Sequence, residues 1–239
     1  KLSLKDLQSY EIEKNNALCY KLDSGYLICG PNLPSSGTVC LIQGLILYEI
    51  LQQKKNQVSL NEILDILNFV YYLRDSKLAD PKFVKINEKD LFDKKKLYGH
   101  FSELNKNQKV LKIDNLNQVL SSTSHFSIAD THGNVLSATS SIESSFGSRL
   151  FTNGFFLNNQ LTDFDFMNED KKGKLKKNRP QGGKRPLSSM SPLIVFDEKK
   201  NFFLSVGSPG GKAIISYVFK TLVDLLFEKQ SIKQSIESP

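Results

Sequence analysis

The apolar run Cys40–Tyr48 limits what this chain can fold into more than any other stretch. It contains Gln43 and is far shorter than the roughly 20 residues that a membrane-spanning helix needs, so a transmembrane protein is not expected. The run lies within Cys40–Gln53, whose apolar residues follow a helical repeat. Of 239 residues, 39% are hydrophobic, and 14 glycines complete an ordinary globular composition. This excludes disordered, collagen-like and disulfide-scaffold classes for the whole chain, and the length predicts one large or two small domains.

More helices are expected before residue 107. Ser59 and Glu62 form a capping box that predicts a helix over Leu60–Leu73. A third, polar helix is expected over Lys89–Leu97. The stretch Asn105–Leu120 is polar and carries little signal, so we predict a loop or linker there.

The pattern of apolar residues changes at Thr123, where short apolar runs separated by turns begin. These runs predict strands over His125–Ala129, Asn134–Thr139, Gly154–Leu157, Leu193–Phe196 and Phe202–Val206. Thr131–Asn134 and Asp197–Asn201 fit hairpin turns, and a broad apolar stripe predicts a helix over Lys212–Phe227. The order of helices, strands and a final helix favours an α+β fold with antiparallel sheets covered by helices.

Positive charge is concentrated in the segment Met167–Arg185, which we call the basic segment. It holds eight Lys and Arg and two acids, which gives +6 of the formal net charge of +7. It contains no aromatic residue for base stacking, so we expect no nucleic-acid partner. Its Gly and Pro residues predict an exposed, mobile loop, with an electrostatic lid or steering patch as the alternative.

The three cysteines, Cys19, Cys29 and Cys40, fit no metal-binding spacing and cannot all pair with one another. We therefore predict buried or unreactive thiols. The sequence as a whole indicates neither a metal nor an organic cofactor. The charged and polar stretch Lys1–Tyr10 does not resemble a signal peptide.

Polar residues capable of chemistry gather in four stretches: 121–130, 157–166, 185–192 and 208–211. SPGG at 208–211 joins a predicted strand to a helix, where successive glycines present N–H groups to an oxyanion or a carboxylate. The adjacent serines of RPLSSMSP suit a carboxylate, and the amide and acidic groups of LNNQLTDFDF suit an ammonium. Each stretch also has a simpler explanation, namely a tight turn, local backbone hydrogen bonding or a polar loop.

None of the three histidines is convincing as a general base. His125 is two residues from Thr123, and near neighbours in a strand rarely have the geometry of a nucleophile–base pair. An N-terminal Thr whose own α-amine takes the proton is a known alternative. That solution requires cleavage of the chain immediately before the nucleophile.

Five motifs occur in an order and at a spacing that resemble the gamma-glutamyltranspeptidase family: TSHFSIAD with a following GN, FGS, GFFLNNQLTDF, RPLSSMSP and GSPGG. Upstream, PSSG and LADPKFV resemble the end of the family's large subunit. The resemblance implies an N-terminal-nucleophile hydrolase fold, the αββα sandwich. It also implies cleavage between Ser122 and Thr123. Residues 1–122 would then be the C-terminal part of a large subunit and 123–239 a small catalytic subunit truncated at its C-terminus.

The resemblance further implies a γ-glutamyl hydrolase/transferase that cleaves glutathione and related amides. Thr123 would be the nucleophile and Ser141 its supporting hydroxyl. The remaining implied roles are the oxyanion hole for Gly210 and Gly211, the α-carboxylate site for Ser188 and Ser189, and the α-ammonium site for Gln160 and Asp163. Water, or an amino acid or dipeptide, would accept the acyl group, and the two subunits of the precursor would form a heterodimer.

Several departures qualify these expectations. Glu143, which we place among the substrate-binding residues, stands where glutathione-handling relatives commonly carry Asn. Ser141 replaces the usual Thr. Nothing in 1–122 matches the region that supplies the relatives' carboxylate-binding Arg, so we expect a fragment of a longer precursor. An acylase of different acyl specificity and an inactive, unprocessed homologue remain alternatives. The family is usually periplasmic or extracellular.

Overall fold

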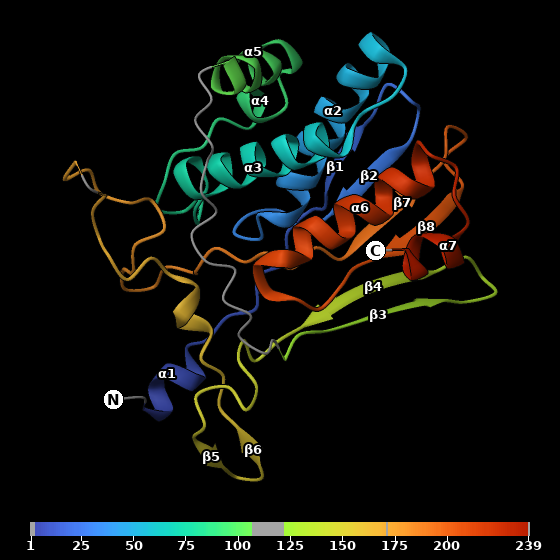
Figure 1. Ribbon diagram of the computed structural model, residues 1–239. Coiled ribbons are helices and arrows are strands. Elements are labelled where there is room, and N and C mark those ends of the chain that lie inside the picture. Colours follow the sequence, from blue (N-terminus) through green and yellow to red (C-terminus); the bar gives the residue numbers. More distant parts are fainter. Residues whose placement is uncertain (1–2, 107–121, 171, 239) are drawn as a thin grey trace.

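The computed structural model describes residues 3–106, 122–170 and 172–238 (Figure 1). The helices are α1 (Leu4–Gln8), α2 (Gly37–Lys55), α3 (Leu60–Lys77), α4 (Glu88–Leu91), α5 (Lys94–Lys106), α6 (Ile214–Leu226) and α7 (Ile232–Glu237), with 3₁₀ helices η1 (Gln160–Asp163) and η2 (Gly211–Ala213). The strands are β1 (Leu18–Lys21), β2 (Leu27–Gly30), β3 (Ser124–Ala129), β4 (Val135–Ser140), β5 (Phe151–Thr152), β6 (Phe155–Phe156), β7 (Leu193–Phe196) and β8 (Phe202–Val206).

The central sheet joins segments from both sides of Thr123. Its four antiparallel strands have the order β1-β2-β7-β8. In the β2–β7 pair, Ile28 lies opposite Val195, and both side chains are fully buried. The two parts that the expected cleavage would create are therefore held together by backbone hydrogen bonds and a shared core.

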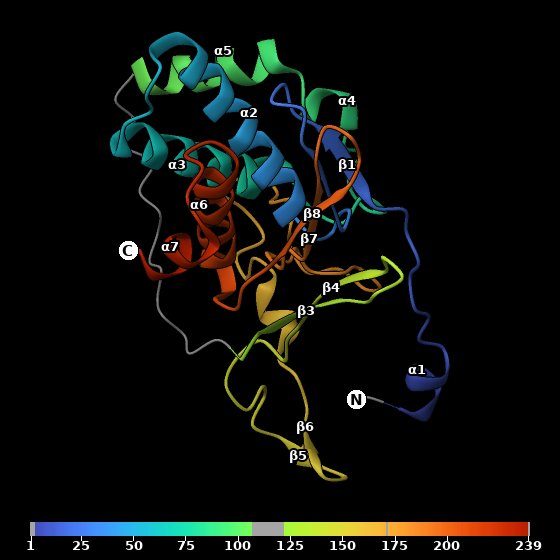
Figure 2. The same ribbon diagram turned by 90° about the vertical axis from the view of Figure 1, so that its right-hand side faces the viewer.

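The molecule is built in layers. Helices α2, α3 and α6 cover one face of the central sheet, with α5 beyond α2 and α3, and the β3–β4 hairpin lies on the opposite side (Figures 1 and 2). The large side chains Phe126, Ile128 and Leu136 of this hairpin are about half exposed. The described residues thus form three layers of the expected αββα sandwich: the helices, the central sheet and the β3–β4 hairpin. No other described element covers the outer face of this hairpin.

Helix α2 forms the centre of the core, and 14 of its 19 residues are buried. Two of its buried polar side chains form hydrogen bonds: Gln43 Nε2 donates to the Leu91 carbonyl at 3.0 Å, and the Glu49 carboxylate accepts the Asp23 and Ser24 N–H groups. A helix apolar on all sides suits burial between α3, α5 and α6. None of the helices in the described ranges is both long and apolar enough to cross a bilayer.

Most predicted elements are confirmed. Cys40–Gln53 lies within α2, Leu60–Leu73 within α3, and Lys212–Phe227 covers all of α6 and the last two residues of η2. The strands Leu193–Phe196 and Phe202–Val206 have the predicted bounds. The capping box also forms, because the Ser59 side chain accepts the Glu62 N–H and the Glu62 carboxylate accepts the Ser59 N–H.

The single helix predicted over Lys89–Leu97 is wrong, since α4 ends at Leu91 and α5 begins at Lys94. Asp93 explains the break: its Oδ1 accepts the Lys96 N–H at 2.9 Å, as an N-cap residue does. The loop predicted at Asn105–Leu120 lies outside the described residues apart from its first two, which end α5.

The prediction of buried or unreactive thiols fails for two of the three cysteines. Cys19 and Cys29 lie directly opposite each other in the β1–β2 pair and form a disulfide, while Cys40 is a buried free thiol. The pairing arises from strand register, which brings two residues with a separation of ten into contact.

The basic segment lacks helix and strand in its described residues, as a loop should, but it is not simply exposed. The side chains of Asn178 and Lys184 are buried. Lys184 Nζ donates to the carbonyls of Lys177 and Arg179 and to the Gln181 side chain. The segment is therefore organised around the buried Lys184 ammonium group, whose three N–H donors match these two carbonyls and one side-chain oxygen.

Two helix glycines offer a matched test of packing. An added Cβ at Gly44 of α2 would lie 2.7 Å from the Phe219 ring of α6, whereas one at Gly99 of α5 would meet nothing within 4 Å. We predict that Gly99→Ala raises the free energy of unfolding by about 0.5–1 kcal/mol. Gly44→Ala should lower it by about 1–3 kcal/mol, because the ring must move. Urea denaturation measures both, and equal stabilisation by the two would contradict this packing.

Candidate active site

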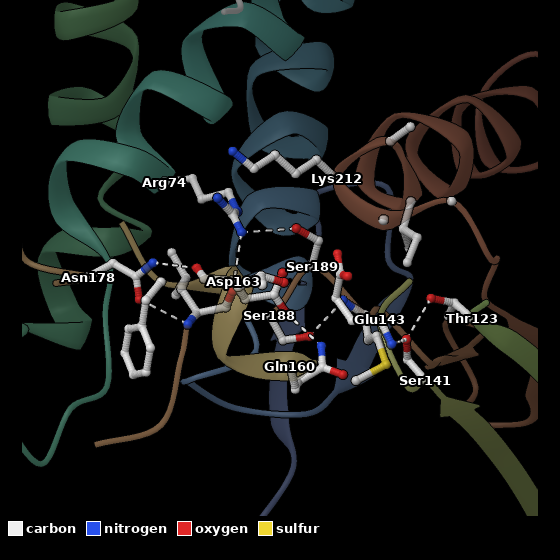
Figure 3. Close-up of a pocket in the computed structure, with 18 of the residues that line it drawn as sticks. Arg74, Thr123, Ser141, Glu143, Gln160, Asp163, Asn178, Ser188, Ser189 and Lys212 are labelled. Atoms are coloured by element: carbon white, nitrogen blue, oxygen red, sulfur yellow. Dashed lines mark hydrogen bonds between the residues drawn. The ribbon is translucent and has the colours of Figure 1, made fainter. Parts of the chain in front are cut away.

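A cavity of about 680 Å³ lies where β3, β4, η1, α3 and the start of α6 meet. It brings together residues from the four polar stretches of the sequence (Figure 3). The predicted site residues that line it are Thr123, Ser141, Glu143, Gln160, Asp163, Ser188, Ser189, Gly210 and Gly211. Ser122 adjoins it through the peptide bond to Thr123.

The β3–β4 hairpin places Thr123 beside Ser141. The Asp130 carboxylate accepts the His132 and Asn134 N–H groups and closes the turn, which fixes the register along both strands. Thr123 is 8% exposed, and its Oγ1 donates to Ser141 Oγ at 3.0 Å. Ser141 Oγ also accepts the Glu143 N–H at 2.9 Å, which holds the supporting hydroxyl in place.

The residue before Thr123 is held as well. The Ser122 N–H donates to the Glu143 carbonyl at 3.2 Å, and the Ser122 hydroxyl donates to the Ser144 carbonyl at 2.9 Å. The Ser122–Thr123 peptide therefore follows a defined path beside Ser141.

The serine pair is positioned by the loop before α2. The Ser188 N–H donates to the Pro34 carbonyl at 3.0 Å, and the Ser188 carbonyl accepts the Ser36 N–H at 2.8 Å and the Ser36 hydroxyl at 2.6 Å. Ser35 Oγ donates to the Met190 carbonyl at 2.5 Å. These bonds satisfy the backbone of an irregular segment and leave the Ser188 and Ser189 side chains at the cavity.

Acidic and amide groups form another part of the wall. Asn159 Nδ2 donates to Glu143 Oε2 at 2.7 Å, and Gln160 Nε2 donates to Asp163 Oδ2 at 2.6 Å. Burial raises the pKa of Asp163 above its usual 3.8, and the charge of Glu143 acts in the same direction. The bond from Gln160 and the charges of Arg74 and Lys212 oppose that rise. A partly desolvated carboxylate of this kind favours a bound cation.

Gly210 and Gly211 lie at the start of η2, directly before α6, with φ of +133° and +57°. A Cβ at Gly210 would lie 2.7 Å from the Tyr217 ring, so this position requires glycine in both conformation and space. Backbone N–H groups at the start of a helix favour a negatively charged oxygen.

Sequence reasoning missed Arg74 and Lys212, which also line the cavity. Arg74 lies on α3 and is 5% exposed, and a single Arg within a helix gives no motif from which its position could be predicted. Lys212 follows the glycine pair directly. Its position next to GSPGG is the sequence signal that indicates a cation at the cavity.

The structure places His125 outside the cavity lining. Its ring packs against Gly207, and its Nδ1 lies 2.9 Å from Thr139 Oγ1. Burial lowers its pKa. Across residues 3–106, 122–170 and 172–238, His, Cys, Asp and Glu form no group of three or more able to hold a metal ion.

Comparison with known proteins identifies relatives of this chain. The chain is 31% identical, over 271 aligned residues, to the glutathione hydrolase proenzyme of Bacillus subtilis (strain 168), covering 98% of this chain and 43% of that protein. It is 30% identical to the glutathione hydrolase proenzyme of Escherichia coli (strain K12), with coverage of 90% and 40%. The chain therefore spans less than half the length of these curated relatives.

The fold has a close counterpart among solved structures. Cephalosporin acylase from Bacillus halodurans superposes with a TM-score of 0.77 at 15% identity, over 100% of this chain and 42% of that one. This likeness in fold, together with the family match that follows, shows the N-terminal-nucleophile hydrolase fold. The family profile described as gamma-glutamyltranspeptidase matches residues 1–239. The chain belongs to the gamma-glutamyltranspeptidase family.

Proposed function

We propose that this chain is part of an autoprocessed γ-glutamyl hydrolase/transferase that acts on glutathione and other γ-glutamyl amides. One observation carries the proposal: a buried threonine hydroxyl bonded to Ser141 shares a cavity with a serine pair and a desolvated acid. A γ-glutamyl group has matching features, namely a carbonyl to be attacked and an ammonium and a carboxylate at its other end. Family membership supports the same activity.

Thr123 acts as the nucleophile after cleavage of the Ser122–Thr123 bond. The freed α-amine accepts the proton of Thr123 Oγ1 as Oγ1 attacks the γ-carbonyl carbon, and no histidine is among the described residues that line the cavity. Residues 1–122 and 123–239 then form parts of a large and a small subunit. Pairing of β2 with β7 supports a heterodimer that survives the cut.

The reaction proceeds through an ester on Thr123. The N–H groups of Gly210 and Gly211 stabilise the negative oxygen of the tetrahedral intermediate, a contribution worth about 2.7–4 kcal/mol per donor in comparable sites. Collapse of the intermediate breaks the C–N bond, and the leaving amine receives the proton. Water then yields glutamate, or an amino acid or dipeptide yields a new γ-glutamyl amide, and Thr123 Oγ1 regains its proton.

Substrate recognition uses the two ends of the glutamyl head group. Gln160, Asp163 and Glu143 hold the α-ammonium, with the charge supplied by the acids. Ser188 and Ser189 hold the α-carboxylate through their hydroxyl groups. A different acyl specificity remains the alternative, because Glu143 has a carboxylate where glutathione-handling relatives commonly have the amide of Asn. Its firm bond from Asn159 places that carboxylate at the cavity.

We also propose a periplasmic or extracellular location. The Cys19–Cys29 disulfide supports it, because disulfides persist in oxidising compartments and are rare in the cytosol.

The function is tested with the complete chain on a panel of γ-glutamyl anilide, glutaryl anilide and a β-lactam side-chain amide. We predict hydrolysis of the γ-glutamyl compound, loss of at least about 10³-fold in kcat with Thr123→Ala, and retained activity with Thr123→Ser, which keeps the hydroxyl. Preference for glutaryl anilide would favour the acylase alternative. Absence of turnover for every amide would favour the inactive homologue.

Replacement of Asp163 should have opposite effects on γ-glutamyl binding and on the stability of the fold. Because folding raises its pKa above 3.8, protonated Asp163 stabilises the fold below that pH, and this contribution is lost as pH rises through the folded-state pKa. We predict that Asp163→Asn raises Tm at pH 7, with the gain disappearing near pH 3, while weakening γ-glutamyl binding.

Asp197 is the matched control, since hydrogen bonds from Asn201 lower its pKa. Its contribution is present above 3.8 and is lost as pH falls through the folded-state pKa. Asp197→Asn should therefore lower Tm at pH 7. Thermal unfolding between pH 3 and pH 7 measures both variants. A lower Tm for Asp163→Asn at pH 7 would contradict the burial of this charge.

A further inference from the structure

We propose that Arg74 is a positioning residue that fixes Ser189 as a hydrogen-bond donor to the carboxylate of an α-amino-acid head group. The proposal rests on the γ-glutamyl function above and adds a specificity determinant to it. The known carboxylate-binding Arg of relatives lies in a region that this chain does not match, whereas Arg74 comes from α3 and reaches the serine pair from inside the protein.

The Arg74 guanidinium group is fixed on every side. Nη2 donates to Ser189 Oγ at 3.0 Å and lies 3.4 Å from the Leu187 carbonyl. Nε donates to Ser36 Oγ at 2.9 Å, and Nη1 donates to Asp75 Oδ1 at 2.7 Å. The side chain of Arg74 is 6% exposed, so its conformation is set before any ligand arrives.

This bond determines which way the Ser189 hydroxyl can act. Arginine has no acceptor, so Ser189 Oγ must accept from Arg74 and its own proton must point elsewhere. Ser188 Oγ is also a hydrogen-bond acceptor, because it accepts the Met190 N–H at 3.2 Å, so its own proton is likewise available for another partner. Within the described ranges, neither hydroxyl donates to a protein acceptor. Both can therefore donate their protons into the cavity, where two neighbouring O–H donors suit the two oxygens of a carboxylate.

The charge around the serine pair supports an anion there. Asp75, the ion-pair partner of Arg74, is 61% exposed at its side chain, so water screens its negative charge. Figure 3 shows Arg74 and Lys212 above the Ser188–Ser189 pair and Gln160 below it. Lys212 forms no ion pair within 4 Å among the described residues. The cations Arg74 and Lys212 thus lie on the side of the pair opposite Gln160, while the acids Asp163 and Glu143 line the same cavity.

A ligand pair that differs only at the α-carboxyl group separates recognition from a purely structural role. L-Glutamate and its α-carboxamide, isoglutamine, share the ammonium and the γ-carboxylate, and both can bind as products without turnover. We predict that the complete chain binds glutamate at least tenfold more tightly than isoglutamine in isothermal titration calorimetry. Arg74→Gln should reduce glutamate affinity by about 10–100-fold and leave isoglutamine affinity within twofold, because only a bond to a charged ligand is weakened.

Arg185→Gln is the matched control. It removes the same charge from a residue that contacts Glu13 and Tyr10 and does not line the cavity, so the preference for glutamate should persist. If Arg74→Gln shows no cooperative thermal transition, Arg74→Lys replaces it. Lysine keeps the positive charge, but its single ammonium group cannot donate to Ser36, Leu187 and Ser189 together. We therefore expect Arg74→Lys to reduce the preference for glutamate by about three- to tenfold, less than Arg74→Gln does.

Equal weakening of both ligands by the Arg74 variants would overturn the inference, because it would indicate a structural role alone. An unchanged preference would overturn it too. Turnover of a γ-glutamyl anilide without any preference for glutamate would leave the proposed function standing and remove the inference. Failure to turn over γ-glutamyl anilide or bind either ligand would remove both.

Discussion

Pairing of β2 with β7 is the interaction on which the rest of the structure depends. It joins the segments before and after Thr123 in one sheet and continues into the bonds between the 34–36 loop and Ser188. The same contacts therefore hold the fold together and fix the serine pair against α3. A cut before Thr123 removes one peptide bond and leaves these hydrogen bonds and the core around α2 in place.

The layers explain why polar chemistry can exist beside so apolar a core. The α2 helix fills the centre, and the cavity opens where α3, η1, the start of α6 and the open end of the β3–β4 hairpin meet. Buried charges there have partners: Arg74 is bonded on three nitrogens, and Asp163 accepts from Gln160. The raised pKa of Asp163 shows that this carboxylate is held at some cost to folding, as expected for a group placed for a ligand.

Local signals predicted much of the fold and of the site. The capping box at Ser59, the helical repeat around Cys40 and the turns at Asp130 and Asp197 involve residues close in sequence, so they can be read without a structure. The motif residues from Thr123 to Gly211 were likewise found, and the structure brings them to one cavity. The roles assigned to them remain proposals.

What could not be predicted depends on distant contacts. The Cys19–Cys29 disulfide follows from strand register, and the contact between Arg74 and Ser189 joins residues separated by 115 positions. The burial of Lys184 depends on the carbonyls that surround it. The break between α4 and α5 was a local signal that was overlooked, since Asp93 is a good N-cap residue.

The central claim, that Thr123 becomes an N-terminal nucleophile, is tested most directly by intact-mass analysis of the purified chain beside Thr123→Ala. The account predicts that the native chain separates into two pieces under denaturing conditions, one of which begins at Thr123, and that both elute together when folded. The variant should stay whole. A native chain that folds and remains uncut, or a variant that is cut at the same bond, would contradict the account.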